Sequence, residues 1–475
     1  MRLRPLALAL LAAGLAVPAS AADLLQAYEL ARKGDPQLAA AEARAAAAQA
    51  GVAQSRAALL PQISAQASLT DSQGDNTSFG AFPAPTPTNP DAVGFGENVS
   101  SSDTRNRRYG LNLSQSIYDH ADYTRLKAAK AQAAQAEAQR VAAEQALGVR
   151  VSRAYFDVLT AIESLASARA QEAAAKRQLD QAETRLEVGL APITDVHEAR
   201  ASYDGARANA IAAATRLDDA REALTEITGQ PMESLKGLGA EYQPKLDDTE
   251  GLQAWVDKAL ADNPALQAAA LALDAAEANV STARAGHLPT LTLSGGYNDS
   301  ATWGSNTTST PVSSVTFPSD NLNDGHNVGI TLTVPIFSGG AVRAGVRSAL
   351  ANRDAASEQL EQERRGVVRQ TRNAYRSLAA GAAEVEARRL AVVSAKAALE
   401  AGEAGLEVGT RTVVDVLLAQ QTLFAAQTQF AQARHNFLVN ELSLKQAAGS
   451  LTPADIEAVN RLLSADAEAL LDATK

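Results

Sequence analysis

The residues best suited to acid–base or metal chemistry are five histidines, which lie far apart in the chain: His120, His197, His287, His326 and His435. His197-Glu198 could begin a zinc-protease motif, but the second histidine that this motif requires four residues after the first is absent. The chain also has no cysteine and no nucleotide-binding loop. The sequence therefore indicates no enzyme, no metal site and no cofactor, and any energy the protein uses must come from a partner.

The N-terminal segment indicates export. Arginines at its start precede an apolar stretch at 6–17 and a small-residue site at 19–21. We expect residues 1–21 to be a secretory signal peptide that is cleaved after Ala21 or Ala22, with a retained anchor as the alternative. The net charge of −11 makes a nucleic-acid partner unfavourable. Without cysteine the chain cannot carry a lipid on an N-terminal cysteine, so any membrane attachment must come from the fold.

Landmarks recur in the same order in the two halves of the chain. Asp35-Pro36 corresponds to Asn263-Pro264, and Glu187-Val188-Gly189 corresponds to Glu407-Val408-Gly409. A repeat of this length indicates one structural unit used twice. The expected divisions are a first repeat at 22–229, a linker at 230–251, a second repeat at 252–449 and a C-terminal tail at 450–475.

Alanine-rich stretches with apolar residues at helical spacing predict most of the secondary structure. Helices are expected at 24–60 with a break near Pro36, 121–186, 194–227, 252–287, 340–405 and 412–448. Apolar residues recur every seven positions in the long helices, in the second half at Leu378, Val385, Val392, Leu399 and Leu406. This period predicts left-handed coiled coils, and short turns at 187–193 and 407–411 make each long helix antiparallel to the next. The helices by themselves are also compatible with an ordinary solvated bundle.

Four segments of about nine to eleven residues alternate between apolar and polar side chains, which predicts strands with one apolar face. These segments are 62–70, 109–118, 290–298 and 328–336. We expect the polar stretches between them, 71–107 and 299–326, to be exposed loops. The segments have the length of tilted membrane strands, and a small soluble β-domain is the alternative.

Four strands cannot close a membrane barrel, because both edges of the sheet would leave backbone groups unpaired in lipid. The chain must therefore oligomerise, and three copies give twelve strands around an open lumen, whereas eight strands would be filled by side chains. The predicted fold is mainly α with membrane β: a trimeric 12-stranded β-barrel, four strands per chain, continued by an α-helical barrel of coiled-coil hairpins that projects about 100 Å from the membrane. The aromatic residues expected to form a girdle are Tyr109, Tyr118, Tyr297 and Phe337, and the strand propensity of aromatic residues is the alternative explanation.

The sequences at the two predicted turns resemble those of the TolC-type outer-membrane factors. The resemblance is carried by residues 188–204 and 408–417, and it extends over nearly the whole chain after the signal peptide. It implies a homotrimer in the Gram-negative outer membrane, with its helices in the periplasm. It also implies a passive exit duct of a tripartite efflux pump or type I secretion system. The implied partners are a periplasmic adaptor (membrane fusion) protein, an inner-membrane pump of the ABC or RND type and outer-membrane lipid.

In that family the closed periplasmic end is held by bonds between neighbouring hairpins, and the matching positions here are Thr194, Asp195 and Arg411. A carboxylate and a guanidinium form a charge-assisted pair, which is worth on the order of 1 kcal/mol when partly solvated. Several such pairs around a trimer could bias a two-state gate. The family has a tyrosine at the position of Leu406, so the resemblance implies a weaker or rearranged latch. A surface ion pair without a gating role is the alternative.

Asp415 matches the first of two aspartates that form acidic rings in the family's constriction, and Leu418 stands at the second position. One ring of carboxylates still favours cations, but less than two rings would, and a solvated helix charge is the alternative. The residues that match the family's adaptor-contact tips are Val188, Gly189, Leu190, Val408, Gly409 and Thr410. The two glycines also suit helix ends that need a left-handed residue, so the adaptor role rests on the resemblance.

Two other classes of protein share some of these features. A structural coiled-coil or adhesin-like surface protein would carry the heptads without apolar-faced strands and would not conduct ions. A periplasmic adaptor would carry a single hairpin flanked by compact, glycine-rich β-domains. The repeat and the paired strands favour the channel, but the sequence does not indicate what is exported.

Overall fold

The computed structural model describes residues 22–190, 192–232, 234–239, 242–245 and 251–472. The predicted signal peptide lies outside the described residues. The chain forms two compact units. The sheet unit contains residues 47–133 and 272–356, and the helical unit contains the described parts of 1–46, 134–271 and 357–475.

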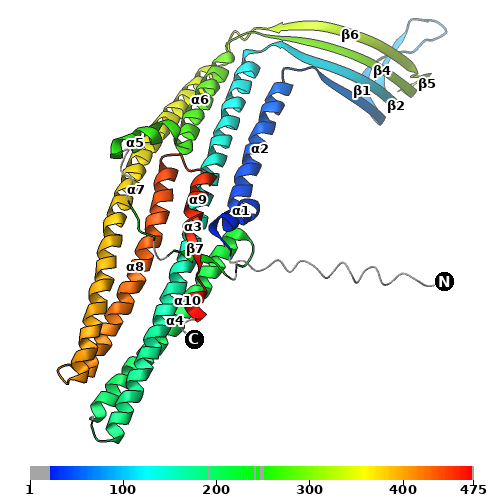
Figure 1. Cartoon of the computed structure of the whole chain (residues 1–475). Helices are drawn as coiled ribbons and strands as arrows, with labels where there is room; N and C mark the ends of the chain where they lie inside the picture. Colours follow the sequence, from blue (N-terminus) through cyan, green and yellow to red (C-terminus); the bar gives the residue numbers. More distant parts are fainter. Residues whose placement is uncertain (1–21, 191, 233, 240–241, 246–250, 473–475) are drawn as a thin grey trace, which may run out of the picture. The chain divides into compact units, whose positions relative to one another are not determined.

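The sheet unit is built on one antiparallel sheet of long strands (Figure 1). Its strands are β1 (Gln62–Pro83), β2 (Val93–Tyr118), β4 (Thr290–Thr310), β5 (Ser313–Pro318) and β6 (Asn321–Thr333). β2 lies between β1 and β4, and both β5 and β6 pair with the other side of β4. β1 therefore forms one edge of the sheet, and β5 and β6 together form the other.

Prolines and glycines separate the strands from the helices that adjoin them. These helices are α2 (Pro36–Ala57), α3 (His120–Glu187), α6 (Pro264–Ala285) and α7 (Ala341–Glu407). Pro61 and Pro289 precede β1 and β4, and a proline cannot continue a helix because its ring fixes φ and its nitrogen donates no hydrogen bond. Gly339 and Gly340 have φ angles of 61° and 85°, which reverse the chain before α7.

The loops predicted at 71–107 and 299–326 are wrong, because most of these residues are strand. β1 stays in one register with β2 along its whole length, and β4 pairs with β5 and β6 over almost all of its own. The register depends on backbone hydrogen bonds, which serine, threonine, asparagine and glycine residues make without needing an apolar face. β6 also ends at Thr333, before the predicted end at residue 336.

The four predicted strand segments coincide with a band of exposed and half-buried apolar side chains on one face of the sheet, which we call the apolar band. The facing pairs in this band are Ile63–Leu113, Leu111–Tyr297, Leu293–Ile330 and Leu291–Leu332. Ile63 is 76% exposed and Leu332 is 63% exposed in the single chain. Beyond the band the same face becomes polar, with Asp71 opposite Arg105. The apolar alternation therefore marks only part of each strand.

The helical unit contains most of α3 and α7, the first turns of α2 and α6, and the remaining elements. These are α1 (Leu24–Gly34), α4 (Ile193–Thr228), β3 (Lys236–Leu238), α5 (Gly251–Asp262), α8 (Val413–Ala447), α9 (Pro453–Asn460), β7 (Leu463–Asp466) and α10 (Ala469–Asp472). Its core is centred on the buried side chains of Tyr155, Phe156 and Leu442. Among the described residues, no helix has a stretch long and apolar enough to cross a membrane.

An acidic or amide residue followed by proline starts the second helix in each half. The Asp35 carboxylate accepts a hydrogen bond from the Leu38 amide at 2.9 Å, and Asn263 accepts from two amides in the first turn of α6 at 2.9 and 3.1 Å. Proline in the first turn loses no helical hydrogen bond. The predicted break near Pro36 is confirmed, whereas the single helix predicted at 252–287 is wrong because the same device divides it into α5 and α6.

A small two-stranded sheet connects the predicted linker to the predicted tail. β3 pairs antiparallel with β7, with Lys236 opposite Asp466. The buried Tyr155 hydroxyl lies 2.7 Å from the Lys236 carbonyl oxygen and 3.1 Å from that of Ala22. The helix α9 begins at Pro453, within the segment predicted as a C-terminal tail. Strands of three and four residues are too short to show alternation, so the sequence contains no signal for them.

The predicted heptad positions face the inside of the coiled coils. Leu378 and Val385 of α7 are buried, and further along α7 the heptad residues pack around Leu423 of α8. In the other hairpin, Leu179 of α3 packs with Val196 of α4. Many of the remaining buried positions are alanine, which allows the helix backbones to approach closely. Each long helix is therefore packed against the helix that follows it.

One histidine is buried between the helices of the helical unit. The His435 side chain of α8 is 2% exposed, its Nδ1 atom lies 2.8 Å from the Thr160 Oγ1 atom, and its ring stacks on Phe156. Its Nε2 atom lies 3.7 Å from a Glu163 carboxylate oxygen. Burial, together with the neighbouring Arg434 cation, lowers the pKa of His435 to about 3. His435 is therefore neutral in the folded protein at neutral pH.

We expect the folded protein to lose stability as the pH falls from 7 to 5. His435 in the unfolded chain binds a proton below a pH of about 6.5, whereas the folded chain does not, so acid favours unfolding with a slope that rises to about 1.4 kcal/mol per pH unit below that pH. Urea unfolding followed by circular dichroism at several pH values measures this slope. The slope should decrease in His435→Gln and persist in the control His197→Gln, whose side chain is exposed. Equal slopes in the wild type and His435→Gln would contradict the assignment.

Candidate functional site

The turn between α3 and α4 is a helix end closed by a left-handed glycine. Gly189 has a φ angle of 74°, its amide donates to the Leu186 carbonyl at 3.0 Å, and the Leu190 amide donates to the Arg185 carbonyl at 2.8 Å. This is the Schellman pattern, which satisfies the last carbonyls of the helix and requires a positive φ. The turn leaves Val188 and Leu190 exposed at 63% and 79%.

The turn between α7 and α8 has the same bonds. Gly409 has a φ angle of 78°, its amide donates to the Leu406 carbonyl at 3.2 Å, and the Thr410 amide donates to the Gly405 carbonyl at 2.8 Å. The Thr410 hydroxyl donates to the same carbonyl at 3.1 Å, and Val408 is 75% exposed. The six residues predicted as adaptor-contact tips therefore lie in two turns of similar geometry.

A capping box starts α8 and involves the aspartate predicted for the constriction ring. The Asp415 amide donates to the Thr412 hydroxyl at 3.2 Å, and the Asp415 carboxylate accepts from the Thr412 amide at 3.0 Å and from its hydroxyl at 2.9 Å. The bonds from Thr412 lower the pKa of the Asp415 carboxyl, so it stays ionised. Leu418, three residues later on the same side of α8, is 62% exposed.

The residues predicted for the latch are placed on both hairpins. The Thr194 hydroxyl donates to the Asp195 carboxylate at 3.4 Å in the first turn of α4. Arg411 lies against its own hairpin, since its amide donates to the Gly405 carbonyl at 3.2 Å and a Cβ atom on Gly405 would come within 2.7 Å of the Arg411 Cγ atom. Among the described residues, Asp195 and Arg411 form no ion pair with each other or with another residue. One chain therefore brings the latch residues to the turns without joining them.

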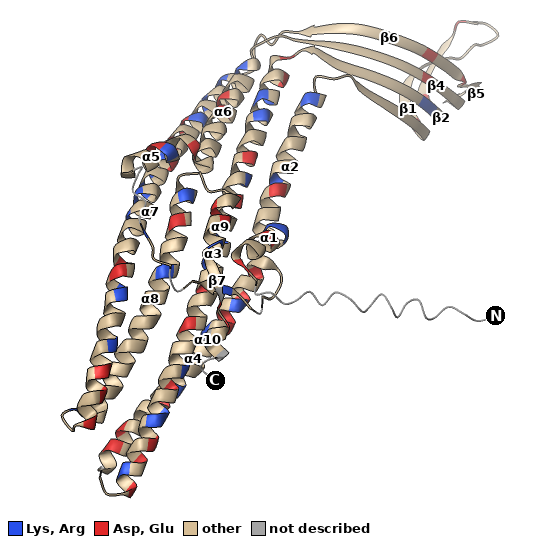
Figure 2. Ribbon diagram, viewed as in Figure 1, with Lys and Arg blue, Asp and Glu red and all other residues tan. Residues whose placement is uncertain are grey.

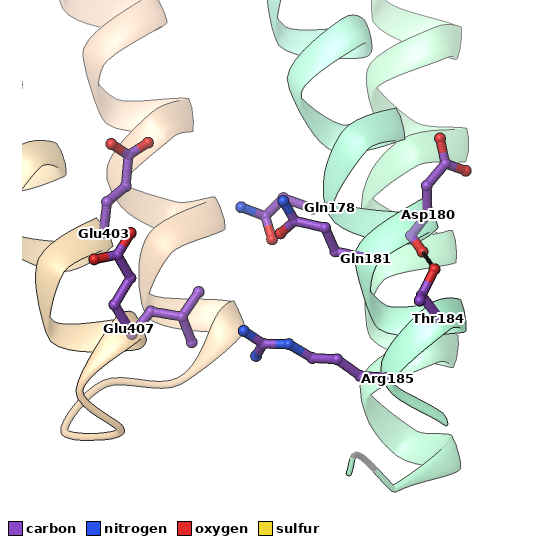
Figure 3. A pocket seen from close by; sticks show the side chains of 8 residues that line it. Gln178, Asp180, Gln181, Thr184, Arg185, Glu403 and Glu407 are labelled. Atoms are coloured by element: carbon purple, nitrogen blue, oxygen red, sulfur yellow. Dashed lines mark hydrogen bonds between the residues drawn. The ribbon is translucent and has the colours of Figure 1, made fainter. Parts of the chain in front are cut away.

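A groove of about 660 Å³ separates the ends of α3 and α7 (Figure 3). Its lining residues are Gln178, Asp180, Gln181, Thr184 and Arg185 from α3 and Glu403, Leu406 and Glu407 from α7. Figure 3 shows Arg185 pointing across the groove toward α7, and Gln178 and Gln181 extending from the same wall. The α3 wall therefore offers hydrogen-bond donors, and the α7 wall offers two carboxylates beside Leu406.

Sequence reasoning did not identify Arg185, Glu403 and Glu407 as site residues. A signal for two of them is present in the sequence. Arg185 and Glu407 are next to Leu186 and Leu406, the last apolar residues of α3 and α7, and Leu406 is also the last of the predicted heptad positions. Residues next to the apolar heptad positions lie at the border of the surface that these positions face. The charged residues of the chain are concentrated on the helices, and the strands carry few of them (Figure 2). A site that depends on charge is therefore a helical site.

Comparison with known proteins assigns the chain to a family. It matches the outer membrane efflux protein family in two stretches, over residues 27–230 and 255–450. The chain belongs to that family. It is 37% identical over 445 residues to outer membrane protein TolC of Vibrio cholerae, with 93% of each chain covered. The predicted resemblance to the TolC-type factors is confirmed.

Two further similarities agree with this assignment. The chain is 31% identical over 443 residues to the alkaline protease secretion protein AprF of Pseudomonas aeruginosa, covering 93% of this chain and 87% of AprF. Its fold is similar to the crystal structure of the Campylobacter jejuni CmeC outer membrane channel, with a TM-score of 0.71 at 19% identity, covering 93% and 90% of the two chains. The expected combination of long helices with antiparallel strands is confirmed.

Removing the cap of α8 should loosen the α7–α8 turn. In Thr412→Ala the helix loses the side-chain acceptor for the Asp415 amide, so we expect amide exchange at residues 412–416 to become about five times faster. Hydrogen–deuterium exchange mass spectrometry measures this rate. Val414→Ala, which changes an exposed neighbour outside the cap, is the control. Unchanged exchange in Thr412→Ala would show that the capping box does not order the turn.

Proposed function

We propose that this chain is the outer-membrane exit duct of a tripartite efflux pump or type I secretion system, a passive channel with a gated periplasmic end. Membership of the outer membrane efflux protein family and the similarity to TolC and AprF support this function. The observation that carries it is the sheet, which has an apolar band on one face and, among the described residues, two edges without a pairing strand. The protein is placed in the outer membrane, where lipid covers the apolar band.

The duct is a homotrimer with a 12-stranded barrel. Within the described residues, β1 pairs only with β2, and β6 pairs only with β4. A bilayer supplies no hydrogen bonds, so a sheet in lipid must close on itself. Three copies that each contribute four strand positions close a barrel wide enough to keep an open lumen, which supports a trimer over a dimer.

The first 21 residues act as the signal peptide that exports the chain, and no lipid is attached. The mature chain consists of two structural repeats at 22–229 and 252–449, the linker at 230–251 and the tail at 450–475. The two separate stretches that match the family support this division. Both repeats contribute one hairpin to the periplasmic end of the duct, and each ends in a glycine turn.

The partners are a periplasmic adaptor protein and an inner-membrane pump of the ABC or RND type. The exposed Val188, Leu190 and Val408 at the turns support adaptor contact, because apolar side chains that stand free at a tip are ready to be covered by a partner. The chain has no nucleotide-binding loop, so the pump supplies the energy. The duct itself performs no chemical step.

The gate is formed by Thr194, Asp195, Leu406 and Arg411, and the constriction by Asp415 and Leu418. Asp195 and Arg411 lie beside the turns without an ion-pair partner among the described residues, which supports pairing with a neighbouring hairpin. A guanidinium and a carboxylate can share two hydrogen bonds, and opening the gate breaks them. Asp415 is fixed in direction by the cap of α8, so its carboxylate is held at one height in every copy.

Single-channel conductance in a planar bilayer tests both the duct and the latch. The wild type should show small, cation-selective steps, and the double variant Asp195→Ala with Arg411→Ser should show larger steps because the periplasmic end widens. Glu198→Ala with Arg207→Ser removes the same charges from exposed positions of α4 and should conduct like the wild type. Unchanged conductance in the double variant would reject the latch. The absence of steps from folded protein would reject the duct and favour a structural coiled-coil protein.

Cation selectivity tests the constriction. Leu418→Asp adds a second ring of carboxylates, so we expect the reversal potential in a salt gradient to shift toward the cation value. Asp415→Asn removes the charge while its side-chain oxygen can still accept the bonds of the cap, and it should shift the potential in the opposite direction. The control Glu29→Gln changes an exposed carboxylate of α1, outside the two hairpins. Equal potentials in all four proteins would place Asp415 outside the constriction.

A further inference from the structure

Exposed arginines form a stripe along α7, which we call the arginine stripe. Its members are Arg365, Arg369, Arg372 and Arg376, which line a shallow groove of about 420 Å³. They recur after four, three and four residues, so they lie on one side of the helix. The opposite side carries the buried residues Val367, Thr371 and Leu378. The stripe therefore faces away from the part of the helical unit on which α7 packs.

The arginine stripe is electrostatically unbalanced. Arg365 pairs with Glu361 at 2.8 Å, but Arg369, Arg372 and Arg376 form no ion pair within the described part of the chain. Like charges one turn apart on a helix repel each other and destabilise it. An acidic surface placed beside the stripe would replace this repulsion with attraction. The stripe thus fits an acidic partner.

α4 carries carboxylates with a matching spacing, which we call the acidic stripe. Its members are Asp219, Glu222 and Glu226, and all three are exposed. They lie on the side of α4 opposite the buried Leu217 and Leu224. No lysine, arginine or histidine among the described residues pairs with them. The helical unit therefore contains two stripes of opposite charge, in which Arg365 alone has an ion-pair partner among the described residues.

The helices α4, α3, α8 and α7 lie in a row in this order. The two stripes lie on the outward sides of the end helices, α4 and α7. The contacts that define the row are Arg200–Glu183 between α4 and α3, Thr160–His435 between α3 and α8, and Arg388–Gln429 between α7 and α8. α4 also approaches α8, on the side of its buried residues. At the groove near the turns, α7 turns Glu403 and Leu406 toward α3, which is again the side opposite the arginine stripe. The stripes therefore face away from each other within one chain.

Contacts along the row relate the height of α4 to that of α3 and α8. The Lys176 ammonium of α3 lies 5.7 Å from the centre of the Tyr203 ring of α4. Because α3 and α4 are antiparallel, residues that lie equally far before Lys176 and after Tyr203 are at about the same height. Thr160 and Asp219 are such a pair, so they are about level. Thr160 contacts His435 of α8. Asp219 is therefore also about level with His435.

A second contact extends this relation to α7. A Cβ atom on Gly381 of α7 would lie 3.6 Å from the Phe437 ring of α8, two residues after His435. Counting along the antiparallel helices then places Arg376 about level with Glu226. Along α7, Arg372 lies one turn away from the level of Arg376 and Glu226. Along α4, Glu222 lies one turn away from the same level in the opposite direction. An arginine side chain can span one turn. The ends of the two stripes therefore meet at the same height when copies stand side by side.

We propose that the arginine stripe of one copy binds the acidic stripe of the next, with Arg372 and Arg376 against Glu222 and Glu226. This inference rests on the proposed function, which arranges copies of the chain in a ring. An interface between two different faces of the same molecule closes into a ring when its rotation allows. Charge-assisted pairs at this interface fix the height of each copy relative to its neighbour and disfavour other registers.

Apolar residues on the same two faces complement each other. Ile211 of α4 is 62% exposed and Leu390 of α7 is 50% exposed, and the contacts above place them about level. Alanines flank both residues on their faces, at positions 208 and 212 of α4 and 383 and 387 of α7. Small residues around a large one allow two helices to pack closely. An acidic adaptor would account for the arginines alone, whereas a second copy also accounts for the acidic stripe and Ile211.

Cross-linking between engineered cysteines tests the interface, and the natural chain has no cysteine to interfere. Thr215→Cys with Ala387→Cys places one thiol on each face at about the same height. A short bis-maleimide should then give covalent dimers and trimers on a denaturing gel. The control pair is Thr215→Cys with Ala401→Cys, in which the second thiol lies about 21 Å further along α7. The control should give no such products.

Charge reversal tests the two stripes. In the cross-linking pair, Arg372→Glu with Arg376→Glu should lower the initial rate of cross-linking about five-fold, because attraction at each interface becomes repulsion. Adding Glu222→Arg and Glu226→Arg to the same chain should restore the rate. Loss without restoration would show that the arginines act elsewhere, and an unchanged rate would show that charge does not hold the interface. Either result would overturn the proposal.

Conductance of the same cysteine variant separates this inference from the proposed function. Normal single-channel steps without cross-linked products would reject the α4–α7 interface and leave the duct intact. The absence of both steps and cross-links in folded protein would reject the duct, and the inference with it. Charge reversal could also abolish export in cells while cross-linking stays unchanged. That result would assign the arginine stripe to an acidic adaptor and overturn the proposal.

Discussion

The unpaired backbone at the two edges of the sheet is the constraint on which the rest of the structure depends. Among the described residues, β1 and β6 each pair on one side only, while the apolar band runs across the strands between them. An N–H or C=O group without a partner in lipid is costly, so the sheet is complete only when neighbouring copies supply the missing strands. The ring that results also determines what the helices must do, because α3 and α7 continue from strands of the sheet unit into the helical unit.

Turn chemistry determines how the helices end and which side chains are free to act. Both hairpins close with a glycine at positive φ and the same pair of backbone bonds, so the exposed valines of the two turns are presented in the same way. The cap of α8 holds Asp415 in a fixed direction, whereas Asp195 and Arg411 are left without an ion-pair partner among the described residues. Local structure thus separates a carboxylate that is held in place from charges that remain available to a neighbouring copy.

The long helices could be predicted from the sequence because proline, glycine and the seven-residue period act locally. The break at Pro36 and the glycine turns follow from such signals, and the missed break at Pro264 had the same signal. The length of the strands could not be predicted from the sequence. The register depends on backbone hydrogen bonds, which any residue type can make, and the polar half of β1 shows no alternation of apolar and polar residues. β3 and β7 depend on a contact between distant segments. The latch and constriction residues follow from the family resemblance, and the arginine stripe lies outside the apolar heptad, so the seven-residue period gives no signal for it.

The most direct test of this account is the mass of the assembled protein, measured by native mass spectrometry of the full mature chain in detergent. We expect a complex of three chains, because only neighbouring copies can pair the edges formed by β1 and β6. A folded monomer with its helices and sheet intact by circular dichroism would contradict it, since the edges would then remain open without loss of structure. A stable dimer would also contradict it, because an eight-stranded barrel leaves no open lumen.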